Sequence, residues 1–399
     1  MTSDDRQPLA PQRGRYFMRH RGFNLLFRSV DALLRALVPR CAPSPRPVRR
    51  ILIANGAHLG DIVLSTAILP VIKAAYPDAR IGMLVGGWAG PVVKNHQLVD
   101  WVHRLDHWRL NRAALSTRAK IQHWWRTRRQ ALREIRARDY DVALDLYFYF
   151  PNSAALLWQA GIPTRIGYTS AGLGPLLTES LDIDMAASRR SIVDFHLDLV
   201  RRIPGIGTAR AELAVPNIPR SPVDLEKIIG PGNYVVLHLG SGSALKDWPE
   251  SSWAMLARQF LAQGRRLVLT GTGTREKEKI ERFRREVPDT LDLCDRLKWN
   301  EFVEIIAHAS LLVASDSVAA HIAAAVDTPA VVTGHGMTNL HLWRPASPRA
   351  VVLMQAVPCA PCYRNGGCST MACLRELAPS TVQAACDALL AAPAAVPAA

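Results

Sequence analysis

The sequence predicts an α/β protein with two successive parallel sheets, each covered by helices. Short apolar runs, which are typical of buried parallel strands, alternate with longer segments of helical periodicity. This alternation stops at a stretch with four prolines, Pro216 to Pro231, and then restarts. A chain of 399 residues is long enough to bury two such cores. We therefore expect two Rossmann-like halves, over 50–215 and 216–387.

The first half opens with an apolar strand over 51–54 and a glycine-containing loop. A helix over 62–76 should follow, and then strands over 80–85 and 141–146. In the second half the expected strands are 234–239, 266–270, 290–293, 311–315 and 329–333. The helices expected between them are 250–263, 275–285, 299–309 and 317–326.

The segment before the first strand, residues 1–49, is expected to be an extension of the fold. Residues 16–40 place Phe, Leu and Val at near-helical spacing among arginines, which predicts a basic amphipathic helix. Such a helix lies on an anionic membrane surface or packs on the protein, and the pattern leaves both open. Prolines over 39–47 indicate a linker, and the Ala/Pro segment 388–399 is expected to be a flexible tail.

Charge is concentrated in two segments. The formal net charge is +15, and residues 1–50 carry 11 Arg against three Asp, whereas residues 103–138 carry 11 Arg and Lys against two acids. No run of 18 apolar residues occurs, which excludes a spanning helix, and the polar, acidic start is unlike a secretory signal. We expect a cytoplasmic protein, bound at most peripherally to the inner face of the membrane.

Ligands of open parallel sheets bind beyond the carboxyl ends of the strands, so the loops there are the candidate sites. After strand 51–54, the loop Asn55 to Asp61 contains two glycines and ends on an acid. Asp61 is either the cap of the next helix or a carboxylate that accepts a proton from a substrate hydroxyl. The position alone does not separate these roles.

Two loops of the second half carry small and cationic residues. Ser241, Gly242 and Ser243 follow a strand and precede Lys246, so backbone N–H groups and a mobile charge could reach phosphate oxygens. After strand 266–270, Gly271 begins a short glycine-containing turn, and Glu276 could hold ribose hydroxyls or cap its own helix.

A third loop carries the most informative residues of the chain. Asp316 and Ser317 follow strand 311–315 and stand at the start of a small-residue helix, with His321 one turn further on. Free N–H groups and the positive end of the helix dipole favour an anion at this point. A capped helix with a packed histidine would have the same sequence.

Taken together, these loops resemble the glycosyltransferase family 9, the ADP-heptose:lipopolysaccharide heptosyltransferases. The resemblance covers about Arg50 to Pro379. The motifs that carry it are Leu59-Gly60-Asp61, Asp139-Tyr140-Asp141 with Arg165-Ile166-Gly167-Tyr168, Lys246-Asp247-Trp248-Pro249, and Asp316-Ser317 with His321 and Thr328-Pro329. Four motifs in this order and spacing make the resemblance specific.

The resemblance implies a GT-B fold, two Rossmann-like domains whose sheets face an interdomain cleft, and an inverting transfer from a nucleotide sugar. Asp61 would be the general base, and Lys246 would stabilise the leaving diphosphate without a catalytic cofactor or metal. The donor, expected to be ADP-heptose or a related sugar, would contact Ser241, Gly242, Ser243, Thr270, Gly271, Glu276, Asp316, Ser317 and His321. The expected acceptor is an anionic glycolipid of the lipopolysaccharide core or a related envelope molecule, with Gly60, Arg104 and Arg109 as candidate contacts.

The chain departs from the family pattern at three places. Val318 stands where the family has glycine, Asn55 or a neighbour replaces an arginine, and Glu276 is displaced by about one residue. Val318 keeps open the alternative of an inactive nucleotide-sugar-binding scaffold in an envelope complex, and the three departures keep a different donor open. A heptosyltransferase that acts on a protein acceptor is a further alternative.

Four of the seven cysteines lie close together in the sequence, at Cys359, Cys362, Cys368 and Cys373. This spacing suits one structural zinc or iron ion, although reduced thiols or disulfides would also account for it. The segment from Arg104 to Arg138 interleaves tryptophan with arginine. A nucleic-acid partner is not expected, because the charge is confined; an anionic acceptor or a solvated helix face would use the same residues.

Overall fold

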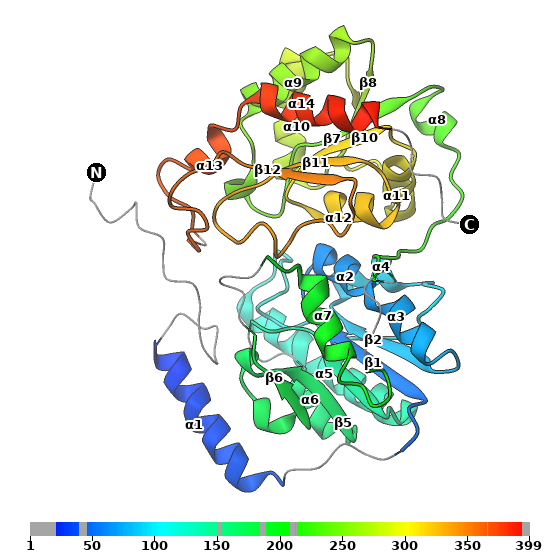
Figure 1. Ribbon diagram of the computed structural model, residues 1–399, viewed down its shortest axis with the longest axis vertical. Coiled ribbons are helices and arrows are strands. Elements are labelled where there is room, and N and C mark those ends of the chain that lie inside the picture. Colours follow the sequence, from blue (N-terminus) through cyan, green and yellow to red (C-terminus); the bar gives the residue numbers. More distant parts are fainter. Residues whose placement is uncertain are drawn as a thin grey trace. The chain divides into compact units, whose positions relative to one another are not determined.

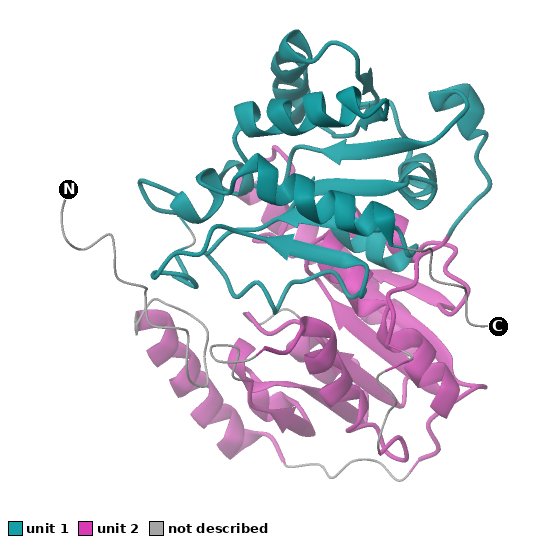
Figure 2. Ribbon diagram, turned by 45° about the horizontal axis from the view of Figure 1, so that its top comes forward, with its two compact units in different colours: residues 1–10, 220–399 teal, residues 11–219 magenta. Residues whose placement is uncertain are grey.

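The computed structural model describes residues 21–39, 46–149, 153–183, 189–207, 212, 214–364 and 366–392. These residues form two compact units (Figure 2). We call the one within 11–219 the N-terminal unit and the one within 220–399 the C-terminal unit. The predicted class of two α/β domains of the GT-B type is confirmed, since each unit holds a six-stranded parallel sheet.

The sheet of the N-terminal unit has the strand order β3-β2-β1-β4-β5-β6. Its strands are β1 (Arg50–Asn55), β2 (Arg80–Val85), β3 (Trp101–Arg104), β4 (Val142–Asp145), β5 (Thr164–Tyr168) and β6 (Glu179–Leu181). Its helices are α1 (Arg21–Leu37), α2 (Leu59–Ser65), α3 (Ile68–Ala75), α4 (Gly90–Val93), α5 (Thr117–Arg138), α6 (Ala154–Gln159) and α7 (Ile192–Val200). Short 3-10 helices are η2 (Gly87–Ala89), η3 (Thr169–Ala171) and η4 (Gly174–Leu176).

The N-terminal sheet buries alternate residues against α5 and α6. Leu52 and Ala54 of β1 share one cluster with Ala131 of α5 and Leu156 of α6. Ile51 and its neighbour Ile53, which point to the other face because side chains alternate along a strand, are also fully buried. A sheet buried on both faces accounts for strands that read as continuous apolar runs.

The helix expected over 62–76 is two helices, because Pro70 interrupts its hydrogen bonds. Proline has no N–H to donate to the carbonyl four residues earlier, which here belongs to Thr66. That carbonyl instead accepts a bond from Leu69 N at 3.0 Å, and the chain bends between α2 and α3.

The sheet of the C-terminal unit repeats the pattern in the order β12-β11-β10-β7-β8-β9. Its strands are β7 (Tyr234–His238), β8 (Arg266–Leu269), β9 (Leu291–Asp292), β10 (Leu311–Ser315), β11 (Ala330–Thr333) and β12 (Ala350–Leu353). Its helices are α8 (Leu225–Ile229), α9 (Glu250–Ala262), α10 (Thr274–Glu286), α11 (Trp299–Ala307), α12 (Val318–Ala325), α13 (Ala372–Arg375) and α14 (Pro379–Ala391), with the 3-10 helix η6 (Ala244–Lys246).

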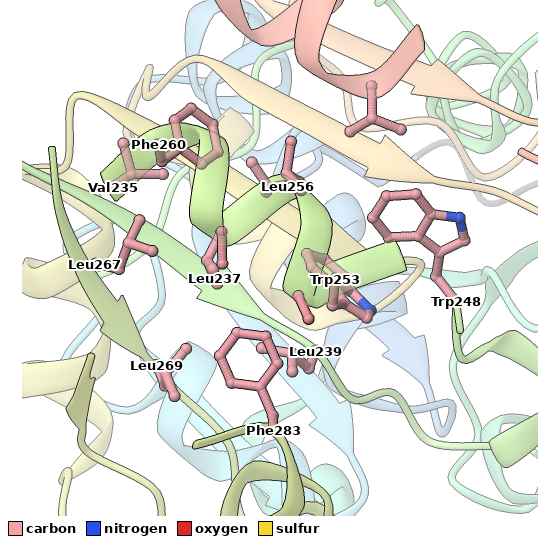
Figure 3. Packing of buried hydrophobic residues seen from close by; sticks show 14 of the residues in the cluster. Val235, Leu237, Leu239, Trp248, Trp253, Leu256, Phe260, Leu267, Leu269 and Phe283 are labelled. Atoms are coloured by element: carbon pink, nitrogen blue, oxygen red, sulfur yellow. The ribbon is translucent and has the colours of Figure 1, made fainter. Parts of the chain in front are cut away.

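One hydrophobic cluster fills the space between this sheet and three helices. Trp253 and Phe260 of α9 and Phe283 of α10 pack on the strand residues Leu237 and Leu269, as Figure 3 shows. Helix α14 contributes to the same cluster and lies beside α9 in Figure 1. This core fixes the starting points of the loops that follow β7, β8 and β10.

In each sheet the order of strands reverses direction at one point. The reversal lies between β1 and β4 in the N-terminal unit and between β7 and β10 in the C-terminal unit. Loops leave a sheet in opposite directions at such a point, so a crevice forms beyond the carboxyl ends of the two strands. The loops containing Asp61, Lys246 and Asp316 follow three of these four strands.

The amphipathic helix predicted at the N-terminus is present as α1, a peripheral helix of the N-terminal unit (Figure 1). Buried Asp31 accepts a hydrogen bond from Leu173 N at 2.9 Å, which fastens α1 to the loop after β5. Residues 16–20 of the predicted helix and 1–15 before it lie outside the described residues, as do 40–45 and 393–399.

Helix α14 continues into the expected tail as far as Ala391. Among described helices, none combines the length and apolarity needed to cross a bilayer.

Candidate functional site

In the C-terminal unit the predicted donor residues surround one ion pair. Lys246 Nζ lies 2.7 Å from Asp316 Oδ2, so the loop after β7 and the loop after β10 are joined at the point where strand order reverses. Both side chains remain partly exposed, at 33% for Lys246 and 22% for Asp316. A cation and an anion that meet at a solvent-accessible sheet edge can exchange partners with a charged ligand.

His335, which sequence reasoning missed, is the second partner of Asp316. Its Nε2 lies 3.2 Å from Asp316 Oδ2, and its side chain is only 1% exposed. Burial by itself raises the pKa of Asp316, but the hydrogen bond from His335 and the charge of Lys246 outweigh it and hold that pKa well below its usual range. Asp316 is therefore a carboxylate at any physiological pH. The sequence did offer a signal for this residue, because a histidine two residues after the predicted strand 329–333 lies at the carboxyl edge of the sheet.

Four buried polar atoms at this edge have no hydrogen-bond partner in the structure: Ser317 Oγ, His321 Nδ1, Thr333 Oγ1 and His335 Nδ1. They come from the ends of β10 and β11 and from the start of α12. Burying an unpaired polar atom is unfavourable, and such atoms cluster where a ligand completes the bonding. Burial also lowers the pKa of His321 to about 4, so its imidazole is neutral near pH 7.

The loop that carries Lys246 is held from one side by α10. Asp247 accepts charge-assisted bonds from Arg275 Nη1 at 2.6 Å and from Lys279 Nζ at 3.4 Å. Ser241 Oγ donates to Ser243 O at 2.8 Å, and Arg275 also donates to the carbonyl of Ser241. Ser241 and Ser243 are thus joined within the loop, with the exposed Gly242 between them.

The remaining predicted donor residues lie after β8. Thr270 Oγ1 is 2.9 Å from Nδ1 of the buried His238, and burial lowers the pKa of His238 to about 4. Glu276 Oε2 accepts from Thr272 N at 2.9 Å, and its side chain fills the space beside Gly271, where an added Cβ would lie 3.0 Å from Oε2. Burial raises the pKa of Glu276. Glu276 thus stabilises the turn Gly271 to Gly273 at the start of α10 by accepting a hydrogen bond from Thr272 N.

In the N-terminal unit, Asp61 is the third residue of α2. Its Oδ2 accepts from His58 N at 3.0 Å, which completes a capping box, so the capping role weighed for Asp61 is present. The negative charge of Asp61 acts on Tyr147, whose pKa is raised mainly by burial, and Arg109 opposes this effect. The charges of Asp61 and Arg109 thus both act on Tyr147, and Gly60 precedes Asp61 in the first turn of α2.

Arg104, the other predicted acceptor contact, is bound to a buried acid. Its Nε donates to Asp106 Oδ2 at 2.7 Å, while Asp106 Oδ1 accepts from Gly87 N at 2.6 Å. This arrangement connects the loops after β2 and β3, and 57% of the Arg104 side chain stays exposed. Arg109 instead lies with its guanidinium carbon 5.8 Å from the ring centre of Trp108.

Sequence reasoning also missed Asp145, which ends β4 opposite Ala54 of β1. Ser153 Oγ donates to Asp145 Oδ1 at 2.6 Å, and burial nevertheless raises the pKa of Asp145 to about 6. The sequence could have indicated Asp145 as a site residue, because it is an acid at the end of a predicted strand. Its position at the strand-order reversal makes it a second acid of this edge.

The four clustered cysteines are all thiols, and Cys362 and Cys373 are buried. Burial raises the pKa of Cys373, an N–H of Gly336 opposes this, and the three other thiols add to the rise, so all four are neighbours. Across 21–39, 46–149 and the other described ranges, however, no group of three or more Cys, His, Asp or Glu is arranged to hold a metal ion. The structural metal therefore stays a prediction.

The chain is similar to known proteins in sequence and in fold. The family model for glycosyltransferase family 9 (heptosyltransferase) matches residues 128–370. Lipooligosaccharide heptosyltransferase 2 of Haemophilus influenzae is 26% identical over 324 residues, which are 76% of this chain and 88% of that protein.

Two solved structures share the fold. The structure of Escherichia coli ADP-heptose lipopolysaccharide heptosyltransferase II has a TM-score of 0.65 at 22% identity and covers 86% of this chain and 98% of its own. Escherichia coli heptosyltransferase WaaC with ADP has a TM-score of 0.63 at 19% identity and covers 85% of this chain and 99% of its own. Since the family model spans more than half of its length, this chain belongs to glycosyltransferase family 9 and is a glycosyltransferase.

Proposed function

We propose that the protein transfers a heptose, or a closely related sugar, from an ADP-sugar to the lipopolysaccharide core or a related envelope acceptor, with inversion at the sugar carbon. The observation that carries this proposal is the Lys246–Asp316–His335 cluster, with its unpartnered buried atoms at the edge of the C-terminal sheet. Relatives named as heptosyltransferases of lipopolysaccharide and lipooligosaccharide support the acceptor class.

Lys246 is the residue proposed to stabilise the leaving diphosphate. When the bond between the sugar and the diphosphate breaks, negative charge accumulates on the diphosphate oxygens. A lysine ammonium that leaves Asp316 for the diphosphate neutralises this charge, and the backbone N–H groups at the start of α12 add fixed donors. Because these groups are oriented before the reaction, they favour the transition state over the ground state. No metal ion or other cofactor is required for this step.

Asp61 is the residue proposed to accept the proton of the acceptor hydroxyl. Its Oδ2 accepts from His58 N, which orients the carboxylate that we assign to the acceptor hydroxyl. The acceptor loses its proton to Asp61 as its oxygen attacks the sugar carbon from the side opposite the diphosphate, which gives inversion. Arg109, whose charge acts on Tyr147 as that of Asp61 does, is proposed to bind a carboxylate or phosphate of the acceptor.

Peripheral binding to the membrane is proposed for α1. Leu26, Leu33 and Leu37 are 53%, 59% and 68% exposed, and they lie on one side of the helix. Arg28 and Arg35 stand on its polar side and are exposed as well. An apolar stripe on a basic helix is typical of segments that lie in the plane of an anionic bilayer surface.

Release of ADP from ADP-heptose in the presence of a lipopolysaccharide-core acceptor tests the proposed function. We expect Asp61→Asn to lower turnover by about 100-fold or more while ADP binding is retained, because only proton transfer is lost. Lys246→Met should lower turnover and weaken ADP binding. UDP- and GDP-sugars serve as donor controls. Full turnover of Asp61→Asn would refute the assigned base, and a strict preference for a UDP-sugar would refute the donor.

Metal analysis tests the proposed structural zinc or iron. If the four thiols bind an ion in the cell, the purified protein contains about one ion per chain, and Cys362→Ser with Cys373→Ser loses the ion and stability. Wild-type protein purified without metal, at unchanged melting temperature, would remove this proposal and leave the transferase proposal intact.

A further inference from the structure

A pocket of about 420 Å³ opens at the amino ends of the N-terminal strands, away from the proposed transfer site. It is lined by Arg50, Arg80, Trp101, Ala137 and Arg138. Arg50, Arg80 and Trp101 are the first residues of β1, β2 and β3. Ala137 and Arg138 are the last two residues of α5. Parallel pairing of Arg50 with Arg80 brings the two arginines side by side.

The pocket is electrostatically unbalanced. Its nearby carboxylate, Asp100, is paired with Arg80, because it accepts from Arg80 Nη1 at 2.6 Å and also from Ile81 N at 2.8 Å. No carboxylate lies within ion-pair distance of Arg50 or Arg138 in the part of the chain that the structure describes. Two of the three arginines that line the pocket, Arg50 and Arg138, therefore have no ion-pair partner among the described residues.

A second acid near the pocket binds the main chain. Asp141 Oδ2 accepts from the backbone N–H groups of Arg49 and Arg50, each at 2.8 Å. These bonds fix the start of β1, and with it the base of the Arg50 side chain. Arg50 Nη1 makes one bond, to the carbonyl of Arg138 at 2.9 Å, which leaves its other N–H groups for a ligand.

Trp101 fixes the orientation of Arg138. The guanidinium carbon of Arg138 lies 4.7 Å from the ring centre of Trp101, and a cation stacked on a ring keeps its N–H edges available. The ring is itself set edge-on against buried Tyr140, with centres 5.9 Å apart and an interplanar angle of 83°. Tyr140 is bonded to His103 at 2.8 Å, so the wall of the pocket is rigid.

The position of this pocket separates it from the transferase chemistry. Strand β1 begins at Arg50 in the pocket and ends at Asn55, next to the loop that carries Asp61. A strand of this length places the two edges roughly 15–20 Å apart. The C-terminal carbonyls of α5 attract Arg50, but attraction to a helix end does not account for Arg80 or for the hollow between the arginines.

We propose that this pocket binds a phosphate-bearing anion, either a soluble organic phosphate or the phosphate of a membrane-lipid headgroup. Planar guanidinium groups bind phosphate oxygens in pairs, and three of them around one hollow give the multiple charge-assisted bonds that such an anion requires. The volume suits an organic phosphate better than a bare ion. This site is independent of the donor diphosphate site in the C-terminal unit.

Fluorine NMR of the full chain labelled with 5-fluorotryptophan tests the soluble source. Trp101→Phe identifies the Trp101 resonance among the ten tryptophans. We expect sn-glycerol 3-phosphate to shift this resonance saturably, whereas glycerol does not. Arg50→Gln with Arg138→Gln should weaken the effect by about tenfold or more, because charge-assisted hydrogen bonds are lost. Arg129→Gln with Arg133→Gln, an exposed pair on the same helix, removes equal charge and should not.

Sedimentation with vesicles tests the lipid source. Vesicles with phosphatidic acid are compared with vesicles of phosphatidylcholine alone, for the same two pairs of variants. Selective loss of binding in the Arg50 and Arg138 pair supports the headgroup, and a response to glycerol phosphate alone supports the soluble ligand. The proposal is overturned if neither probe responds, or if both arginine pairs weaken binding equally. If the double variant Arg50→Gln with Arg138→Gln has a lowered melting temperature, Arg80→Gln is used in its place.

Discussion

Asp316 shows how one carboxylate organises the donor side of this enzyme. It holds Lys246 in the resting protein, and His335 is available to keep the carboxylate in place when Lys246 turns to a diphosphate. Without His335, releasing Lys246 would leave Asp316 as an uncompensated charge beside an anionic ligand. His335 is thus a positioning residue that acts through Asp316.

We expect His335→Leu to weaken ADP binding by about fivefold to tenfold and to lower kcat, with little effect on adenosine, which has no phosphate. His335→Gln, whose amide nitrogen can donate to the same carboxylate, should restore most of the binding. In an Asp316→Asn background, His335→Leu should have no further effect if it acts only through this carboxylate. Additive losses in this double-mutant cycle, measured by calorimetry, would contradict the role.

Val318, which departs from the family pattern, is accommodated without backbone strain. It is the first residue of α12, and it is absent from the residues with a left-handed backbone, the one conformation that would require glycine. The backbone of α12 therefore accepts valine at this position as readily as glycine. We expect Val318→Gly to lower stability slightly, because glycine disfavours a helix, with turnover within about threefold of wild type.

Asp145 gives a pH dependence of stability with a defined sign. Its pKa is about 6 in the folded protein against an ordinary 3.8, so the folded state retains a proton that the unfolded state releases. The contribution of protonated Asp145 to the free energy of unfolding is then fully present below about pH 4, and it is lost as the pH rises through 6. Relative to Asp145→Asn, the wild type should lose up to about 3 kcal/mol of unfolding free energy over this window. Denaturant titrations of both proteins at pH 4 and pH 7 measure it, and parallel profiles would contradict it.

At the level of elements, most strands recognised in the sequence are fully buried, although β5 is buried as well and was missed, because Arg165 and Gly167 interrupt its apolar pattern. β1, β7 and β10 are continuous apolar runs, and they carry the loops that form the site. β3, β6 and β12 were missed because their residues are only partly buried and their sequences are mixed. The helix break before Pro70 could have been predicted from the missing N–H. The position of His335 after a strand was a signal, but its bond to Asp316 follows from the folding of two loops and cannot be read from the sequence.

Helix α1 provides a test of membrane binding at this level. Leu26 and Leu33 are seven residues apart and share the exposed stripe, whereas Leu25 and Ala32 lie about 100° further around the helix. We expect Leu26→Asp with Leu33→Asp to lower binding to anionic vesicles by about tenfold or more. Leu25→Asp with Ala32→Asp changes the charge equally and should retain most binding. Equal losses for both pairs, measured by flotation, would show that charge alone governs the association.

For the whole molecule, each unit has a large hydrophobic cluster of its own. The cluster around Trp253 and Phe260 contains only residues from 235 to 386, whereas the cluster around Leu52 and Leu156 contains only residues from 52 to 162. No buried side chain of either cluster belongs to the other. Damage to one core should therefore unfold its own unit first.

Phe260→Ala tests this independence. Phe260 is fully buried in the C-terminal core, so its truncation should remove about 3–5 kcal/mol of stability from that unit. Amide hydrogen exchange followed by mass spectrometry should show faster exchange in β7, β8 and β10 and little change in β1 and β4. Leu52→Ala should give the reverse pattern. If Phe260→Ala accelerates exchange in β1 and β4 to the same extent, the units unfold as one cooperative body, and their separate cores do not make them separate folding units.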